Sequence, residues 1–229
     1  MTLTCKIYGA RDLRLEDTAS TELGATDVEL RLGAGGICGS DLHYFQHGRV
    51  GSFVVREPLI PGHEASGIVA RIGASVSRVK VGDKVAINPS HACGQCDYCL
   101  GGRFNLCRKM RFLGSASVFP HVQGMFSERF TMGERQLTPI HEDISLGELA
   151  CAEPLSIGLH AVHRAGALLG KTVLVMRRNH RLHECDGRQD GRRGASHRCR
   201  HRAACARRGA PGRRRRMRSL RPCLGTGFD

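Results

Sequence analysis

Residues 91–107 read HACGQCDYCLGGRFNLC and place four cysteines at the spacing C-x2-C-x2-C-x7-C. Four thiolates close a tetrahedral zinc shell and leave no open position, which is typical of a structural site. The glycines between the cysteines let the backbone fold tightly round an ion. The pattern therefore predicts one structural Zn²⁺, with Cys93, Cys96, Cys99 and Cys107 as its ligands.

Two other interpretations of these cysteines stay open. An iron–sulfur cluster also takes four thiolates, and four unrelated buried cysteines need no metal. The chain has eleven cysteines and no apolar leader at its N-terminus, which argues for metal ligation rather than disulfides. No stretch approaches the roughly 20 apolar residues of a membrane helix. We therefore expect a soluble, cytoplasmic protein without a membrane partner.

Three further segments carry candidate ligands for a second, open metal site. They are GICGSDLHY from residue 36, PGHEASG from residue 61 and CAEPLSIGLHA from residue 151. Cysteine, histidine and carboxylate together supply three protein ligands and leave a position for water or substrate. An ion in such a site lowers the pKa of a bound hydroxyl group. Each of these residues alone is typical of an ordinary buried or solvated side chain, so the prediction rests on their conjunction beside the four-cysteine lobe.

These motifs carry a family resemblance. GGICGSDLHY, PGHEASG, the four-cysteine lobe and EPLSIGLHA resemble, in this order, the zinc-dependent medium-chain dehydrogenases of the sorbitol dehydrogenase-like branch. The resemblance covers about residues 5–175. VAINPS before the lobe and MRFLGSASVFPHVQGMFSER after it look closest to the L-idonate 5-dehydrogenases, which interconvert L-idonate and 5-keto-D-gluconate. The resemblance implies an NAD- or NADP-dependent enzyme that acts on a CH–OH group of a polyol or sugar acid, with one catalytic and one structural Zn²⁺.

The resemblance also implies how the open site is built. Cys38 and His63 match the family's catalytic zinc ligands. Glu64 matches a carboxylate that ligates zinc in some members, and the resemblance implies that it is also a catalytic residue. Glu153 stands where other branches place a second cysteine, and it would bind zinc directly or through water. Asp41 is expected to hold one of the ligands in place.

Further residues near these motifs are predicted to handle the proton and the substrate. Ser40 matches the hydroxyl that hands on the substrate proton, and His43 the relay towards solvent. Tyr44 and Phe119 are candidates for lining the substrate pocket. His121 is a candidate partner for a substrate carboxylate, although a surface histidine is the favoured interpretation.

Residues 1–150 have the pattern of a β-rich domain. Val28, Leu30 and Leu32 alternate with polar partners, as in a half-buried strand. Further strands are expected in the β-branched runs at 66–72 and 83–88. The resemblance implies that this part is a GroES-like zinc-binding catalytic domain.

Residues 151–176 are expected to begin an α/β Rossmann domain that is not completed. A linker helix is predicted at 154–164, with Pro154 at its first position and Gly166 as its stop. The unbroken apolar run KTVLV at 171–175 is expected to be the first strand. No G-x-G-x-x-G follows it, so the sequence predicts no place for the cofactor.

Residues 177–229 differ sharply from the rest. They hold 17 of the 35 Lys and Arg residues, all of them Arg, and only 4 of the 21 Asp and Glu residues. The remainder is close to neutral, which excludes an evenly basic nucleic-acid-binding domain. The tail has few large apolar residues, and we expect it to be disordered.

Three interpretations of this tail compete. Its arginines could contact phosphate as a nucleic-acid-binding arm, and its cysteines and histidines could bind metal, although their spacing matches no zinc module. The favoured interpretation is translation out of frame from a GC-rich gene. Codons permitted for residues 176–183, read one nucleotide later, include Cys-Ala-Gly-Thr-Ile-Gly-Cys-Met, which resembles a phosphate-binding G-A-G-T-I-G turn.

The resulting hypothesis separates ancestry from present activity. By family, the chain is a zinc-dependent dehydrogenase; as written, it is expected to be inactive because the cofactor domain is missing. The alternative is a fragment of a sorbitol or other polyol dehydrogenase that acts only as a zinc-binding module. The intact family forms homo-oligomers, and the tail is expected to bind nucleic acid only non-specifically. The exact substrate and the choice between NAD and NADP are not fixed by the sequence.

Overall fold

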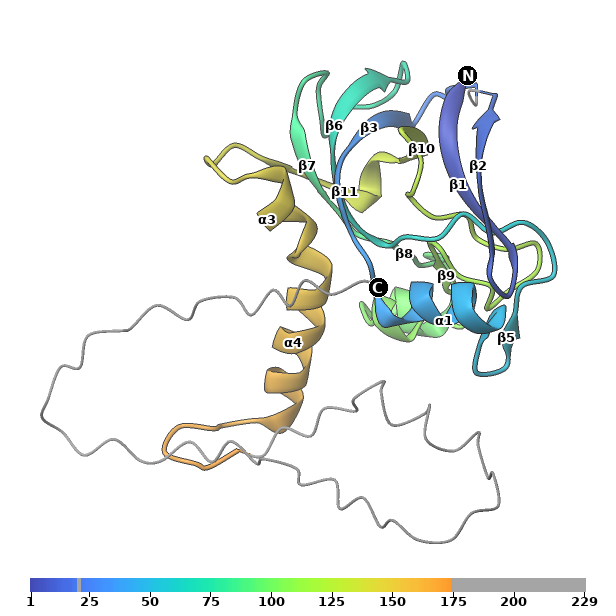
Figure 1. Ribbon diagram of the computed structural model, residues 1–229. Helices are drawn as coiled ribbons and strands as arrows, with labels where there is room; N and C mark the ends of the chain where they lie inside the picture. The colour runs from blue at the N-terminus through green and yellow to red at the C-terminus, as the bar shows by residue number, and fades with distance from the viewer. Residues whose placement is uncertain (20–21, 174–229) are drawn as a thin grey trace, which may run out of the picture. The chain divides into compact units, whose positions relative to one another are not determined.

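The computed structural model describes residues 1–19 and 22–173, which belong to one compact unit, Met1–Val173 (Figure 1). The strands of this part are β1 (Thr2–Gly9), β2 (Asp12–Thr18), β3 (Asp27–Gly36), β4 (Arg49–Val50), β5 (Phe53–Val54), β6 (Glu64–Ile72), β7 (Lys84–Ile87), β8 (Ser90–His91), β9 (Arg111–Phe112), β10 (Arg129–Gly133) and β11 (Leu137–Ile140). Its α-helices are α1 (Gly39–His47), α2 (Asp97–Leu100), α3 (Leu146–Ala150) and α4 (Ala152–Ala165). Two short 3-10 helices, η1 (Phe104–Leu106) and η2 (Glu134–Gln136), complete it. The predicted disordered tail at 177–229 lies outside the described residues.

A five-stranded antiparallel sheet forms the centre of this unit. Its strand order is β10-β3-β6-β7-β11. The three strands predicted within residues 1–150 are confirmed as β3, β6 and β7. Val28 and Leu30 are fully buried on β3, as the alternation predicts, and the polar residue between them, Glu29, is buried as well. The β-rich architecture expected from the sequence is therefore the one observed.

Two apolar clusters stabilise the unit. The larger one lies on the five-stranded sheet and comprises Val28, Leu30, Ala65, Val69, Val79, Val85, Ile87, Met125, Met132 and Leu137. The smaller one lies against α1 and comprises Ile7, Tyr44, Leu59 and Ala116. Burial of such aliphatic side chains is worth about 1.5–3 kcal/mol each. The two clusters therefore fix the sheet and α1, the two elements that carry the candidate site.

A buried carboxylate ties three strands of the sheet together. Glu29 on β3 is only 5% exposed, and its oxygens accept from Arg129 of β10 at 2.9 Å and from Arg71 of β6 at 3.3 Å. The two guanidinium groups supply the partners that a buried charge needs. This arrangement explains why the charged side chain between Val28 and Leu30 can be buried.

The helix α3 is held to the sheet by polar contacts. The buried Ser66 hydroxyl on β6 donates to the carbonyl of Leu146 at 2.6 Å. Ser145 caps α3, because its hydroxyl accepts from the Glu148 N–H while the Glu148 carboxylate accepts from the Ser145 N–H. This capping box lowers the pKa of Glu148. The start of α4, which follows directly, is thereby placed beside β6 and β7.

The helix predicted at 154–164 is confirmed as α4, which begins two residues earlier. Pro154 therefore occupies the third helical position rather than the first, still within the first turn, where a missing N–H is tolerated. Gly166 ends the helix with a positive φ of 75°. The structure differs at 171–175: Lys171, Thr172 and Val173 form no strand, and the last two residues lie outside the described range. A strand needs a neighbour to pair with, and the described residues offer none there.

Candidate metal centres

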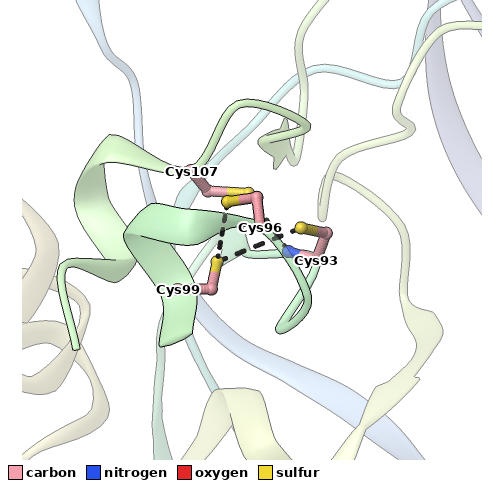
Figure 2. Close-up of side chains that lie close together, drawn as sticks. All are labelled: Cys93, Cys96, Cys99 and Cys107. Atoms are coloured by element: carbon pink, nitrogen blue, oxygen red, sulfur yellow. Dashed lines mark hydrogen bonds between the residues drawn. The ribbon is translucent and has the colours of Figure 1, made fainter. Parts of the chain in front are cut away.

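The four-cysteine lobe is closed by the pairing of β8 with β9, and it contains α2 and η1. The sulfur atoms of Cys93, Cys96, Cys99 and Cys107 all lie within 4.8 Å of one another. Figure 2 shows them turned towards a common centre. The Cys96 and Cys99 sulfurs are 3.5 Å apart, and those of Cys93 and Cys99 are 4.0 Å apart. A tetrahedron with Zn–S bonds of about 2.3 Å has sulfurs about 3.8 Å apart, and the two distances of 3.5 and 4.0 Å lie on either side of that value.

Backbone N–H groups surround these sulfurs and favour their ionised form. The Cys107 sulfur accepts from the N–H groups of Cys93 at 3.2 Å and Lys109 at 3.3 Å. The N–H groups of Arg108 and Cys99 lower the pKa of Cys96 to about 6. Burial raises the pKa of Cys99, whose charge is offset only when a cation is present. A zinc ion supplies that cation, and it needs thiolates as ligands.

The outside of the lobe is stabilised by charged and aromatic side chains. Arg108 forms a two-bond ion pair with Asp97, with both distances 2.8 Å. This pair lowers the pKa of Asp97. The guanidinium groups of Arg103 and Arg108 lie 5.0 and 4.8 Å from the centre of the Tyr98 ring. These contacts stiffen the turn between α2 and Cys107.

A second cluster brings together Cys38, His63 and Glu64, whose ligand atoms lie within 4.8 Å of one another. Cys38 immediately precedes α1, whereas His63 and Glu64 lie at the start of β6. The end of β3 meets this point, since Gly36 pairs with Glu64. Three of the four residues predicted as open-site ligands are thus assembled from two distant segments.

The backbone before His63 is packed too closely for side chains. Gly62 has a φ of 93°, which favours glycine. A Cβ on Gly114 would come within 2.9 Å of the Gly62 carbonyl oxygen. This tight glycine packing fixes the position from which the His63 side chain projects.

Asp41 links the two segments, as expected. Its carboxylate accepts from the Cys38 N–H at 2.9 Å and from the Gly62 N–H at 3.1 Å. The same group lies 3.8 Å from His63 Nδ1, a buried atom with no hydrogen-bond partner among the described residues. That distance is too long for a hydrogen bond. A small movement of the ring would let Nδ1–H donate to Asp41 and leave Nε2 for a metal ion, the usual orientation of a histidine ligand.

Glu153 lies near this cluster but outside the set of mutually close ligand atoms. It is half-buried in the first turn of α4, and burial raises its pKa, while His63 lowers it and Glu64 raises it further. Glu153 also lines a hollow of about 310 Å³ together with Phe112 and Ser156. This position suits a carboxylate that reaches a metal through a water molecule or contacts a substrate.

Phe112 is a residue that the sequence analysis missed. Its ring lies 5.3 Å from the His63 ring, at an interplanar angle of 59°. Phe112 belongs to β9, so the strand pairing that closes the four-cysteine lobe also carries this ring to the open cluster. No local pattern signals this contact, because it depends on how the lobe folds back.

The predicted proton-handling residues lie on α1. Ser40 and His43 are half-buried and stand one turn apart, directly after Cys38. The His43 ring lies 5.6 Å from that of His47, one turn further on. Ser40, His43 and His47 thus follow one another along α1, starting next to the open cluster. The proton relay through Ser40 and His43 stays a prediction.

Two other predicted residues, Tyr44 and His121, have different surroundings from those expected, and the role of a third, Phe119, stays a prediction. Tyr44 lies in the smaller apolar cluster, 3% exposed, and its hydroxyl accepts from the Ala116 N–H at 3.0 Å. Tyr44 is therefore a core residue, because α1 turns it inward.

Phe119 is 62% exposed. His121 is 5% exposed rather than on the surface, and both of its ring nitrogens have backbone partners, the Arg56 N–H and the Val118 carbonyl. Neither nitrogen is available to a substrate carboxylate.

Comparison with known proteins agrees with this geometry. Residues 24–142 match the family described as the alcohol dehydrogenase GroES-like domain. The chain belongs to this family. The match contains the complete four-cysteine lobe and three of the four predicted open-site ligands, all but Glu153.

Relatives with known names include sorbitol dehydrogenases, D-xylulose reductases and L-idonate 5-dehydrogenases. L-idonate 5-dehydrogenase of Escherichia coli strain K12 is 41% identical over 175 residues, which is 76% of this chain and 50% of the relative. Its crystal structure superimposes with a TM-score of 0.69 at 38% identity, over 73% of this chain and 47% of that one. Sorbitol dehydrogenase of Bacillus subtilis strain 168 is 38% identical over 170 residues, 74% of this chain and 47% of the relative.

A further solved structure was determined with a bound nucleotide. It is a zinc-binding dehydrogenase of Sinorhizobium meliloti 1021 bound to NADP, with a TM-score of 0.64 at 31% identity, over 72% of this chain and 46% of that one. This chain spans about half the length of the curated relatives it matches. No helix in residues 1–19 and 22–173 has the length and apolar character needed to cross a membrane.

Proposed function

We propose that the described part of this chain is the zinc-binding half of a dehydrogenase that oxidises a secondary alcohol of a polyol or sugar acid. In this proposal one Zn²⁺ is held by the four-cysteine lobe and stiffens it. A second is held by Cys38, His63 and Glu64, with Glu153 as a direct or water-bridged partner. The observation that carries the proposal is the convergence of Cys38, His63 and Glu64 within 4.8 Å, braced by Asp41.

The chemistry follows from an open metal site. When bound, the metal supplies a Lewis acid that lowers the pKa of an alcohol substrate's hydroxyl. Oxidation of a CH–OH group releases that hydroxyl proton and transfers a hydride to NAD or NADP. In this proposal Ser40 takes the proton from the hydroxyl, and His43 passes it towards solvent. Asp41 holds the backbone of Cys38 in place and lies beside His63 Nδ1. Phe112 covers one side of the His63 ring and shields it from water.

For the substrate, we propose L-idonate, converted to 5-keto-D-gluconate, because the relative from Escherichia coli carries that activity in its name. Sorbitol is the second candidate, and the similar identity of the Bacillus subtilis relative supports it. The hollow beside Glu153 and Phe112, about 310 Å³ in volume, has room for a six-carbon chain. A third possibility is that the chain acts only as a zinc-binding module.

We propose that residues 177–229 are translated out of frame, as their composition suggests. The proposed domain limits are 1–150 for the zinc-binding domain, 151–176 for the start of the Rossmann domain and 177–229 for the tail. Resequencing the gene across codons 170–185 tests it. A shifted frame predicts that one added or lost base restores a glycine-rich turn, and an unchanged sequence would remove this part of the proposal.

The function is tested without a cofactor by replacing zinc with Co²⁺, whose visible spectrum reports its ligands. We expect the spectrum of the full chain to change on addition of L-idonate, less so with sorbitol, and not at all in a Cys38→Ala variant. A chain whose cobalt spectrum responds to no polyol or sugar acid would contradict the proposed function. Steady NAD reduction by the purified chain with L-idonate would show instead that it is active as written.

A further inference from the structure

Two histidines of α1 stand one helical turn apart. His43 is half-buried, and His47, four residues further on, is exposed. Side chains at i and i+4 of a helix lie on the same face, one above the other. The two ring centres are 5.6 Å apart, with an interplanar angle of 37°. We call these residues the α1 histidine pair. The proposed function uses only His43, and the pairing with His47 calls for a reason of its own.

The α1 histidine pair has the geometry of a bidentate metal site. Two histidines four residues apart on one helix are a recurrent way of holding a divalent ion. Metal–nitrogen bonds of about 2.0–2.1 Å place the centres of two coordinating imidazole rings roughly 4.5–5.5 Å apart. The observed separation of 5.6 Å is close to this range. A small rotation of the two side chains therefore brings one nitrogen of each ring to a common ion.

The end of α1 also favours a cation at this place. His47 lies in the last turn of the helix, which ends at Gly48. The last backbone carbonyls of a helix carry partial negative charge and attract a cation. Imidazole nitrogen is a good ligand for Zn²⁺, Ni²⁺ and Cu²⁺. Because the pair supplies only two ligands, water fills the other positions, and the ion exchanges more readily than one held by four thiolates.

We propose that the α1 histidine pair binds a third, exchangeable divalent transition-metal ion, and that this ion stops the proton relay. A neutral imidazole has one nitrogen with a free electron pair. When that nitrogen of His43 ligates a metal ion, His43 can no longer accept a proton from Ser40. The inhibitory consequence rests on the proposed function, whereas binding of the ion does not. An exchangeable ion is lost on dialysis and does not add to the zinc that the chain retains.

Carbethoxylation by diethyl pyrocarbonate tests the proposal one histidine at a time. The reagent acylates an imidazole nitrogen that has a free electron pair, and peptide mapping by mass spectrometry reports each histidine separately. The full chain is loaded with zinc, freed of excess metal, and treated with and without Ni²⁺. At a Ni²⁺ concentration tenfold above the dissociation constant, mass action leaves about a tenth of the sites empty, so modification of His43 and His47 should slow about tenfold. His141 is exposed and has no histidine three or four residues away, so its modification rate should stay unchanged.

Three variants at exposed positions identify the second ligand. In His47→Ala, Ni²⁺ should no longer protect His43. In His47→Cys, which restores a second ligand, the protection of His43 should return. The matched control Gln46→Ala changes the exposed neighbour in the same turn and should leave the protection as in the parent. Because protection of His43 reports the loss of its free electron pair, the same measurement tests both the binding and the block of the relay.

The outcomes separate this inference from the proposed function. Unchanged modification of His43 and His47 in the presence of Ni²⁺ would overturn it, as would equal protection of His43 in the parent and in His47→Ala. The retained zinc and the cobalt spectrum report the proposed function, and neither should differ between His47→Ala and the parent. A chain without zinc whose His43 is still protected by Ni²⁺ would remove the proposed function and leave the third metal site standing.

Discussion

The four-cysteine lobe and the Cys38–His63–Glu64 cluster use similar ligands but are built in different ways. All ligands of the lobe come from residues 93–107, a single short segment that lies between β8 and β9. The ligands of the open cluster come from the starts of α1 and β6, which are fixed by buried apolar residues and by Asp41. We therefore expect the lobe to need a metal ion to fold, and the open cluster to be shaped by the fold before any metal binds.

The largest expected effect is loss of a lobe ligand. We expect Cys99→Ser to remove the lobe zinc and lower the free energy of unfolding by about 3 kcal/mol or more, because metal binding there is also folding energy. Thermal unfolding and limited proteolysis within 97–108 measure this. The control Cys151→Ser changes an exposed cysteine and should shift stability by less than about 0.5 kcal/mol. Equal stability of both variants would mean that the lobe folds without its ion.

The second prediction concerns the brace of the open cluster. Asp41→Ala leaves the buried N–H groups of Cys38 and Gly62 without their acceptor. We expect a loss of about 2–3 kcal/mol in stability and about 10–100-fold weaker metal binding at the open cluster. Denaturant unfolding and zinc titration measure the two effects. Asp143→Ala, an exposed control, should change neither; an Asp41 variant that binds zinc normally would contradict the role given to Asp41.

The third prediction tests the contact between the two regions. Phe112→Ala removes the ring that lies beside His63, so we expect weaker zinc binding at the open cluster, by about tenfold or less, and about 1–2 kcal/mol lower stability. The lobe zinc should stay in place. Phe104→Ala in η1, which is 57% exposed, provides the matched control. Should the two variants bind zinc alike, the lobe and the open cluster would be independent.

The four-cysteine lobe could be predicted from local spacing alone, because all its ligands lie close together in the sequence. Cys38, His63 and Glu64 could be proposed from the conjunction of ligand types in separate segments, and the family resemblance supplied their roles. That they meet depends on the pairing of β3 with β6, which no local pattern encodes. Phe112, the inward turn of Tyr44 and the buried environment of His121 depend on long-range packing that no local pattern encodes. The spacing of Leu155, Leu159 and Val162, by contrast, is a local pattern, and it predicted the helix α4 correctly.

The smallest expected effect lies far from both metal centres and serves as a baseline. Glu134 accepts from the N–H groups of Ser77 and Arg78, both at 2.9 Å, and these bonds lower its pKa from the ordinary 4.5. A lowered carboxyl pKa stabilises the fold above the unfolded-state value and ceases to do so as the pH falls through the folded-state value. Glu134→Gln should therefore be slightly less stable than the parent at pH 7, and the difference should vanish as the pH falls through the folded-state pKa of Glu134. Paired thermal scans check this, and a constant difference at all pH values would contradict it.

The most direct test of the whole account is the zinc content of the purified full-length chain measured by elemental analysis. We expect two zinc ions per parent chain. A Cys38→Ala/His63→Ala double variant should bind one zinc ion and keep the unfolding profile of its lobe, and a triple variant that also carries Cys99→Ser should bind none. A parent chain without zinc, or a double variant with unchanged zinc content, would contradict the assignment of these two regions as metal centres.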